Sequence, residues 1–269
     1  MGLDKGGKFD KIVRDIKSVK IQGARNIARA AVQAYFLLPS AKSKKILLAS
    51  RPTEPMMKNV LQMVGTSSEE EIIGHFDTAQ EKINKIVFGL IKNNSIILTH
   101  CHSTNVTGSL VYARKKGKRF NVYVTESRPL FQGRKTAKEL RKAGIPVTMF
   151  VDSAIDVALS GKNRVTAVFI GADALIKKGV INKIGSGLIA KISKQEKTPF
   201  YVIADSWKFT KAKVPIEQRS LNEIWDEAPK NVKIKNPAFE FVSKEYIAAV
   251  ITEHGLMKYD KFVKIVSRK

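Results

Sequence analysis

Reactive and acidic residues follow several short apolar runs in this chain. They are one thiol and four carboxyl groups, namely Cys101, Glu126, Asp152, Asp173 and Asp205. If these runs are parallel strands, the groups meet at one edge of the sheet, where open α/β sheets bind their ligands. An aspartate in such a place can instead cap the helix that follows, and we expect this of Asp152. The sequence therefore predicts a ligand pocket where the strands before Cys101 and Asp173 end.

Cys101 is the only cysteine of the chain, so disulfides within the chain are excluded and the thiol is either structural or functional. Ser103 and Thr104 follow where a helix should begin. Backbone amides and hydroxyl groups at a helix start can bind an anion, and the positive helix end would lower the pKa of the nearby thiol. His102 is more typical of a structural histidine beside a buried strand, so we leave it out of the predicted chemistry.

Metal ions and nucleotide cofactors are not expected. His75, His100 and His254 show no spacing typical of metal ligands. Residues 185–187 read Gly-Ser-Gly, but the remaining glycines of a dinucleotide fingerprint are missing, and no phosphate-binding loop of the Walker type occurs. We therefore predict no metal and no cofactor.

Basic residues dominate the charge of the chain. There are 48 lysines and arginines against 24 acidic residues, which gives a formal net charge of +24. The lysines are spread along the whole chain without an arginine-rich arm or a recognisable module, so we do not predict nucleic-acid binding. A field of this sign would concentrate phosphorylated metabolites or acidic protein partners. Four basic residues would suit a doubly phosphorylated ligand if they converge: Arg25, Arg51, Lys183 and Lys208.

The first third of the chain has a helical pattern. Apolar residues recur every three or four positions over residues 9–38, with a break at Gln22-Gly23. Further helices are predicted at residues 56–63 and 69–92. We therefore predict an N-terminal helical domain over residues 1–92.

From residue 93 on, short apolar runs alternate with amphipathic segments. The predicted strands are 95–100, 121–126, 147–152, 167–173 and 200–205, and the predicted helices are 106–116, 136–142, 154–159 and 187–194. This alternation favours a parallel sheet with helices on both faces. The predicted fold class is α/β, with a Rossmann-like parallel sheet domain over residues 93–269 after the helical domain.

The sequence also bears on location. No run of about 18 apolar residues occurs, so no membrane span is predicted. The basic N-terminus lacks the apolar core of a signal peptide. We therefore expect the protein to be cytoplasmic.

Several segments, taken together and in this order, resemble one protein family. They are 97–103, 124–129 with Gln132-Gly133, 136–140, 144–147, 171–173, 181–185 and 207–209. The same order is typical of the superfamily of initiation-factor 2B-like proteins, and the resemblance covers nearly the whole chain. This group contains archaeal ribose-1,5-bisphosphate isomerase, methylthioribose-1-phosphate isomerase, and the regulatory subunits of the guanine-nucleotide exchange factor of translation initiation.

The resemblance implies an enzyme similar to archaeal ribose-1,5-bisphosphate isomerase. Isomerases of this group carry a cysteine after Thr-His and an aspartate after Gly-Ala, as Cys101 and Asp173 do here, whereas the regulatory subunits generally lack this pair. Cys101 would then be the base, as a thiolate, and Asp173 the acid. The implied reaction converts ribose 1,5-bisphosphate to ribulose 1,5-bisphosphate through a phosphoenolate, in nucleotide (AMP) salvage. The family would place the substrate against Gly23, Ala24, Arg25, Arg51, Ser103, Thr104, Asn105, Asn182, Lys183 and Lys208.

An alternative stays open within the same family. The chain could be a non-catalytic subunit similar to the alpha subunit of initiation factor 2B, which would bind a phosphorylated ligand and a translation initiation factor. In either case the family implies a homo-oligomer, a dimer or a hexamer. The chain departs from the family pattern between Asp173 and Asn182, where the loop is one residue shorter and Lys178 replaces the usual asparagine before glycine. This departure bears on whether the site is active.

Overall fold

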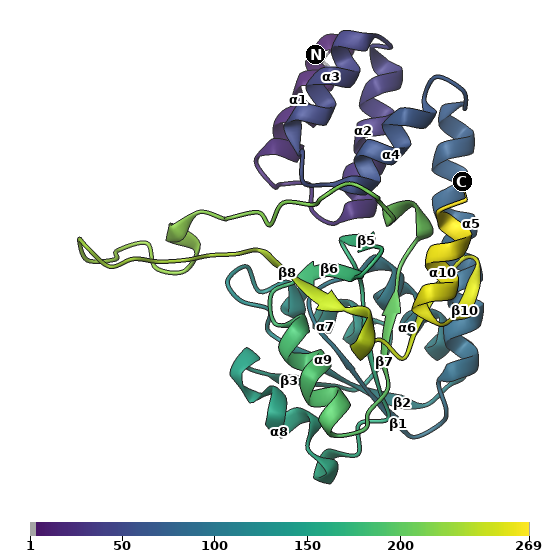
Figure 1. Cartoon of the computed structure of the whole chain (residues 1–269), viewed down its shortest axis with the longest axis vertical. Coiled ribbons are helices and arrows are strands. Elements are labelled where there is room, and N and C mark those ends of the chain that lie inside the picture. The colour runs from purple at the N-terminus through teal and green to yellow at the C-terminus, as the bar shows by residue number, and fades with distance from the viewer. Residues whose placement is uncertain (1–3, 269) are drawn as a thin grey trace.

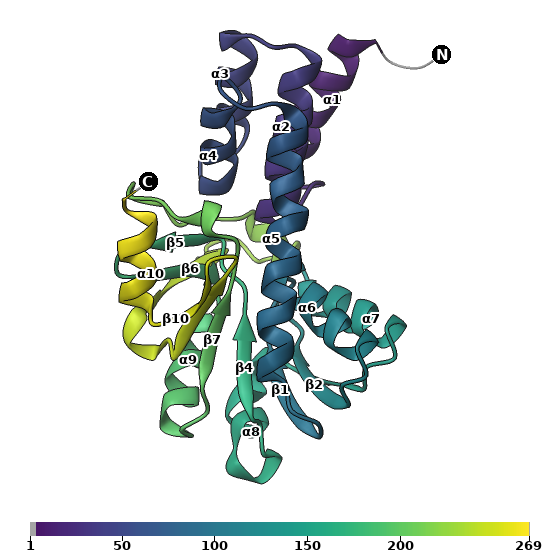
Figure 2. The same ribbon diagram turned by 90° about the vertical axis from the view of Figure 1, so that its right-hand side faces the viewer.

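The computed structural model describes residues 4–268 and stacks a helical part on a part built around a sheet (Figure 1, Figure 2). The helical part contains α1 (Lys5–Lys17), α2 (Ala24–Leu37), α3 (Ala41–Ser50), α4 (Pro55–Met63) and the first half of α5 (Glu69–Leu90). The predicted helices of this region are confirmed, whereas α3 is an additional helix whose lysines and serines leave little apolar periodicity. Over the described residues, no helix combines the length and the apolar character needed to cross a membrane.

Local signals fix where these helices begin. Ser68 and Glu71 form a capping box at the start of α5, where three glutamates of the first turn also complement the helix dipole. The predicted break at Gln22-Gly23 is the joint before α2. Gly23 has a φ of 85°, which glycine adopts without strain, so α2 can begin at Ala24.

The second part is a seven-stranded sheet in the order β10-β9-β7-β4-β1-β2-β3. Its neighbouring strands pair in parallel except β9 and β10. The strands are β1 (Ser95–Thr99), β2 (Phe120–Thr125), β3 (Val147–Phe150), β4 (Ala167–Ile170), β7 (Phe200–Ile203), β9 (Ala249–Thr252) and β10 (Gly255–Met257). The helices are α6 (Thr104–Lys115), α7 (Gln132–Lys142), α8 (Ile155–Leu159), α9 (Ser186–Gln195) and α10 (Tyr259–Val266). The predicted Rossmann-like α/β fold is confirmed, and β9, β10 and α10 extend it.

The strand order reverses between β1 and β4. From β1 the chain moves outward through β2 and β3, and from β4 it moves through β7 and β9 in the opposite direction. Ligands of such sheets bind beyond the carboxyl ends of the strands at this reversal. Cys101 follows β1 and Asp173 follows β4, so the topology places both residues there.

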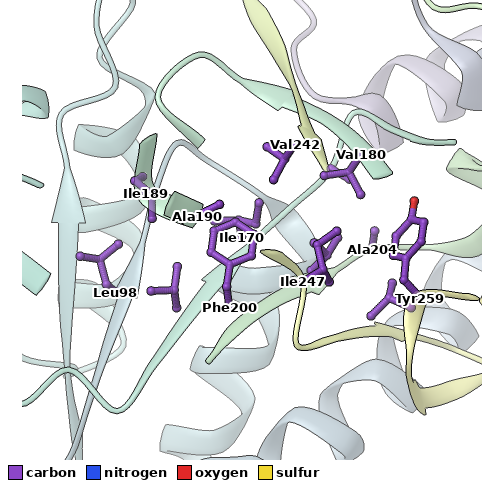
Figure 3. Close-up of a cluster of buried hydrophobic side chains, with 14 of the residues drawn as sticks. Leu98, Ile170, Val180, Ile189, Ala190, Phe200, Ala204, Val242, Ile247 and Tyr259 are labelled. Atoms are coloured by element: carbon purple, nitrogen blue, oxygen red, sulfur yellow. The ribbon is translucent and has the colours of Figure 1, made fainter. Parts of the chain in front are cut away.

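Hydrophobic clusters cover both faces of the sheet, because successive residues of a strand point to opposite faces. Ile97 of β1 packs in a cluster with side chains of α5 and α6. Its neighbour Leu98 packs in the cluster on the other face, part of which Figure 3 shows around Phe200 and Ile189. The helix α5 serves two cores, since its Phe76 belongs to the core of the helical part. The predicted domain boundary at residues 92 and 93 stays a prediction.

A small antiparallel sheet and an arm complete the fold. The small sheet has the order β5-β6-β8, with β5 (Ala174–Ile176), β6 (Gly179–Lys183) and β8 (Phe239–Ser243). Residues 210–238 between η3 and β8 form an extended arm that projects from the body (Figure 1). The short 3-10 helices are η1 (Asp152–Ala154), η2 (Gly161–Asn163), η3 (Ser206–Lys208), η4 (Leu221–Glu223) and η5 (Lys244–Tyr246).

The shortened segment after Asp173 is the turn of a hairpin. Strands β5 and β6 pair from Ala174 with Ile181 to Ile176 with Gly179, which leaves Lys177 and Lys178 as a two-residue turn. Both lysines are exposed. The sequence alone predicts only a loop here, because the strands are too short to show a clear alternation.

Candidate active site

A pocket opens at the reversal of strand order, between the helical part and the sheet. Its walls come from the start of α2, the segment before α4, the residues after β1 and β4, the end of β6, and η3. Most of the predicted site residues line it, namely Gly23, Ala24, Arg25, Arg51, Cys101, Ser103, Thr104, Asp173, Asn182, Lys183 and Lys208. Both parts of the molecule therefore contribute to one site.

Not every group at a strand end reaches this pocket. Glu126 turns away and binds Arg134, whose Nε donates a hydrogen bond to Glu126 Oε1 at 3.0 Å. Asp205 accepts a hydrogen bond from the backbone N–H of Trp207 at 2.8 Å, and its carboxylate lies 3.2 Å from His75 Nε2. These carboxylates serve local structure, whereas Cys101 and Asp173 line the pocket.

Asp152 does not cap the helix that follows it, contrary to our expectation. Its two carboxylate oxygens accept hydrogen bonds from the backbone N–H groups of Ser127 at 2.7 Å and Arg128 at 2.6 Å. Asp152 lies at the end of β3, next to the loop after β2, so the unpaired amides of that loop are closer than those of its own helix. The residue therefore orders the loop that carries Ser127.

Cys101 has a backbone conformation that is rare for any residue except glycine. Its φ is 64°, in the left-handed region. The backbone N–H donates a hydrogen bond to Ser127 Oγ at 2.8 Å, and the carbonyl accepts one from Thr136 Oγ1 at 2.9 Å. These two bonds from separate elements hold the strained residue, so its side chain points into the pocket with little freedom.

The two strand ends approach each other closely because residue 171 is a glycine. A Cβ atom at Gly171 would lie 2.6 Å from both Cβ and Oγ of Ser103, which is too close for any larger residue. The absence of a side chain lets the end of β4 pack against the loop after β1. Asp173 thereby comes to line the same pocket as Cys101.

The surroundings of Cys101 and Asp173 disfavour their charged forms. Burial raises the pKa of the Cys101 thiol to about 12, and the nearby Asp173 carboxylate adds to the rise. Burial also raises the pKa of Asp173, against the opposing effects of Lys208 and Arg51. The expected lowering of the thiol pKa by the helix start is wrong, because Ser103 and not Cys101 is the N-cap of α6 and burial dominates.

The histidines beside Cys101 have structural roles. His100 is 3% exposed, and its two ring nitrogens lie 2.5 Å from Thr125 Oγ1 and 2.8 Å from the carbonyl oxygen of Ile184. Burial lowers the pKa of His100, which keeps the ring neutral. His102 Nε2 lies 3.0 Å from Glu139 Oε1 on α7. Both residues therefore tie the loop after β1 to its neighbours.

Two lysines give the pocket a positive charge that the described residues do not neutralise. Lys183 is 4% exposed and Lys208 is 5% exposed. Within residues 4–268, neither ammonium group has a carboxylate within 4.0 Å, and Lys208 Nζ donates a hydrogen bond to the Ala172 carbonyl at 2.6 Å. Burying an ammonium group without a counter-ion is costly, so this arrangement favours an anionic ligand.

The arginines of the pocket are held in place by carboxylates. Arg51 Nη2 lies 2.7 Å from Glu217 Oε2 on the arm, and Arg25 Nη2 lies 2.6 Å from Asp77 Oδ1 on α5. A guanidinium group has five donors, so each arginine can bind a ligand as well. The arm thus helps to position Arg51 at the pocket.

Asn105 is the one predicted binding residue that does not line the pocket. It lies buried inside the first turn of α6, where its Nδ2 donates a hydrogen bond to Gln80 Oε1 at 3.0 Å. The same Gln80 oxygen accepts a hydrogen bond from Arg25 Nη1 at 3.3 Å. Asn105 therefore stands behind Arg25 and supports it through Gln80.

The pocket also contains residues that our sequence analysis does not single out. They include Glu54, Lys135 and Arg219. Glu54 directly precedes Pro55 at the start of α4, where a carboxylate is an ordinary helix-start residue. No spacing pattern in the sequence distinguishes Glu54 from an ordinary helix cap. Its position in the pocket depends on how the two parts of the molecule pack.

Comparisons with known proteins agree with the predicted resemblance. A model of the Initiation factor 2 subunit family matches residues 58–259. The chain is 36% identical to ribose 1,5-bisphosphate isomerase of Archaeoglobus fulgidus, over 89% of this chain and 86% of the relative. It is 34% identical to the protein of the same name from Methanocaldococcus jannaschii, over 90% and 89% of the two chains.

Among solved structures, the translation initiation factor eIF-2B of Pyrococcus horikoshii OT3 superimposes with a TM-score of 0.83 at 25% identity. The alignment covers 93% of this chain and 96% of that one. Agreement thus extends from local segments to the whole topology, and the predicted resemblance is confirmed. The chain belongs to the Initiation factor 2 subunit family.

Proposed function

We propose that this protein is an aldose–ketose isomerase that converts ribose 1,5-bisphosphate into ribulose 1,5-bisphosphate through a phosphoenolate. The observation that carries the proposal is one pocket lined by a thiol, Cys101, a carboxyl group, Asp173, and two buried lysines. Relatives named ribose 1,5-bisphosphate isomerase, aligned over 89% and 90% of this chain, support the enzyme class. A place in nucleotide (AMP) salvage and a homo-oligomeric assembly follow from the resemblance and belong to the same proposal.

The reaction needs one group that moves a proton at carbon and one that moves protons at oxygen. The Asp173 carboxyl group donates its proton to the ring oxygen as the bond between C1 and that oxygen breaks. The Cys101 thiolate takes the proton from C2, which leaves the phosphoenolate, and the thiol returns the proton to C1. The Asp173 carboxylate takes the proton of the C2 hydroxyl group as the ketone forms. Both residues therefore end in their starting states.

The surroundings favour the starting state of Asp173 more than that of Cys101. Asp173 must begin protonated, which its raised pKa favours. A neutral Asp173 no longer adds to the rise in the pKa of Cys101, and Lys183 lowers that pKa. A proton on Asp173 therefore removes one cause that disfavours the thiolate, while burial, the largest cause, still favours the neutral thiol.

The phosphates would bind at two helix starts and the buried cations. The start of α2 offers the amides after Gly23 together with Arg25, and the start of α6 offers Ser103 and Thr104. Asn182, Lys183, Arg51 and Lys208 complete the proposed substrate site. A bisphosphate would thus neutralise cations that the protein leaves unpaired.

The activity assay compares two variants in the pocket with one outside it. Purified protein is incubated with ribose 1,5-bisphosphate and assayed for ribulose 1,5-bisphosphate. We expect Cys101→Ser and Asp173→Asn each to lower kcat by about 10²–10⁴-fold, because each removes a proton-transfer group. Glu126→Gln is the matched control, since this strand-end carboxylate binds Arg134 outside the pocket, and it should keep kcat within about twofold.

If the wild type makes no more product than Cys101→Ser or Asp173→Asn, the isomerase proposal fails. In that case the regulatory-subunit alternative becomes the better explanation, and the fold similarity to the translation initiation factor of P. horikoshii supports it. Calorimetry with ribose 1,5-bisphosphate would show whether the pocket binds the ligand without converting it. Light scattering on the purified protein tests whether it forms a homo-oligomer.

A further inference from the structure

Glu54 is a buried acid of the pocket that the proposed reaction does not use. It occupies the N-cap position of α4, where the backbone N–H of Met56 approaches its carboxyl group without forming a regular capping hydrogen bond. It is 6% exposed and lines the pocket together with Asp173 and Lys208. Within the described part of the chain, its Oε1 is buried and has no hydrogen-bond partner.

An unpartnered buried oxygen of this kind calls for an explanation. Most buried polar side-chain atoms in folded proteins have a partner, so an orphan atom indicates a group that binds there. Glu54 lines the cavity, so its carboxyl group lies at the edge of the space that a ligand would fill, although its Oε1 is closed to solvent. The cavity also holds the buried lysines, which favour an anion.

We propose that Glu54, in its protonated form, is a ligand-binding residue that donates a hydrogen bond to an oxygen of the phosphorylated ligand. The function proposed above matters here only for the identity of that ligand, because any phosphate or sulfate oxygen can accept the bond. An ionised Glu54 would instead repel a ligand with several negative charges.

Burial favours the neutral form of Glu54. It raises the pKa of this carboxyl group to about 8, and the charge of Asp173 adds to the rise. Lys208, Arg51 and the backbone N–H of Met56 act in the opposite direction. Burial, the largest of these causes, favours the protonated form of Glu54 whether or not Asp173 is charged.

The cations that face Glu54 already have other partners. Arg51, on the same segment, is paired with Glu217 of the arm at 2.7 Å. Lys208 Nζ on η3 donates to the Ala172 carbonyl at 2.6 Å. The remaining charged groups that line the pocket from neighbouring elements are Arg25 on α2, Lys135 on α7, Lys183 on β6 and Arg219 on the arm.

Ligand binding should therefore weaken as the pH rises. Below the pKa of Glu54 the carboxyl group keeps its proton and donates the hydrogen bond. Above it, a proton must be taken up on binding, so the apparent Kd rises about tenfold per pH unit. A phosphate monoester loses its second proton near pH 6, and sulfate does not titrate in this range, so neither ligand causes a change above pH 8.

The test measures binding in a Cys101→Ser background, which prevents turnover. Ribose 1,5-bisphosphate and sulfate are titrated by calorimetry between about pH 6.5 and 9.5 into this parent and into the added variants Glu54→Gln and Glu54→Ala. Glutamine keeps a donor of the same shape without a titrating proton, so we expect its affinity to stay within about threefold across the range. Alanine lacks the donor and should bind about tenfold more weakly than glutamine at pH 7.

The parent protein should lose about tenfold in affinity per unit above pH 8. If Glu54→Gln shows the same alkaline loss as the parent, Glu54 is not the titrating group and the inference is wrong. A flat parent profile for both ligands overturns it as well, even if Glu54→Gln fails to fold. Sulfate binding with the expected pH dependence but no binding of ribose 1,5-bisphosphate supports the role of Glu54 and contradicts the proposed substrate.

Discussion

Lys183 shows how ligand binding and folding oppose each other at a single residue. Its side chain is 4% exposed and has no carboxylate within 4.0 Å among residues 4–268. Taking an ammonium group out of water without a counter-ion destabilises the folded protein. A bound phosphate would supply the missing negative charge. The buried lysine therefore strengthens ligand binding but destabilises the protein without a ligand.

Replacing Lys183 by methionine should therefore stabilise the empty protein and weaken ligand binding. We expect Lys183→Met to raise the free energy of unfolding by about 1–3 kcal/mol in urea denaturation, because a chain of similar length fills the site without a charge. Affinity for ribose 1,5-bisphosphate, measured by calorimetry, should fall by at least about tenfold. Lys178→Met, at an exposed lysine of the hairpin turn, should change neither value, and a less stable Lys183→Met would contradict the argument.

The sequence predicts which residues follow strands, but not which of them turn into the pocket. Cys101 and Asp173 could be located because their strands are neighbours at the reversal of strand order. Glu126 and Asp205 have partners, Arg134 and His75, that only the folded chain brings near them. Glu54 escapes sequence analysis for the same reason, since the two parts of the molecule must pack before it is buried.

At the scale of elements, the segment after Asp173, where the chain departs from the family pattern, forms the hairpin of β5 and β6. The turn consists of Lys177 and Lys178, which do not line the pocket. The residues that matter lie at the other end of β6, where Asn182 pairs with Glu240 and Lys183 with Phe239 of β8. Pairing with β8 fixes their register independently of the turn.

Lengthening the turn should therefore leave the site intact. Insertion of one asparagine between Lys177 and Lys178 should keep kcat/KM for ribose 1,5-bisphosphate within about threefold, because the register between β6 and β8 is unchanged. The matched control inserts one residue between Ile181 and Asn182. That change moves Lys183 to the opposite face of the strand and should reduce kcat/KM by at least about 100-fold. Equal losses from both insertions would show that the turn length matters.

The central strands were predictable because they are buried on both faces and form short, nearly continuous apolar runs. The sequence does not predict β5, β6 and β8: β5 has three residues and β8 is partly exposed, and β6, although buried along its five residues, pairs only with these two strands. The extra strand β10 is equally short, at three residues. Short elements on the rim of a fold depend on their neighbours, so local sequence carries little signal for them.

At the scale of the whole molecule, the site depends on how the helical part docks on the sheet. Asn59 of α4 makes a direct link, because its Nδ2 donates hydrogen bonds to the carbonyl oxygens of Trp207 at 2.7 Å and Phe209 at 2.9 Å. These carbonyls flank Lys208 in the sequence. The segment that Asn59 holds is therefore also the segment that places Lys208 in the pocket.

Asn59→Leu should loosen this docking without touching the ligand. Leucine has a similar size but no donor, so two carbonyl oxygens lose their partner and the free energy of unfolding should fall by about 1–3 kcal/mol. On the proposed function, Lys208 binds the ligand and takes no part in proton transfer, so KM should rise by about tenfold while kcat changes less than about threefold. Steady-state kinetics and urea denaturation check both values. Lys58→Ala, at the exposed neighbour, serves as the control, and an unchanged KM in Asn59→Leu would refute the link.

The left-handed backbone at Cys101, with its φ of 64°, also has an evolutionary consequence. Glycine adopts this conformation freely, whereas another residue is strained there by about 1–2 kcal/mol. A lineage that no longer needed the thiol could gain stability at this position by a single substitution to glycine. On the proposed function, the need for the sulfur offsets this strain, and replacement of the cysteine by glycine in a related chain would mark the loss of the proposed reaction.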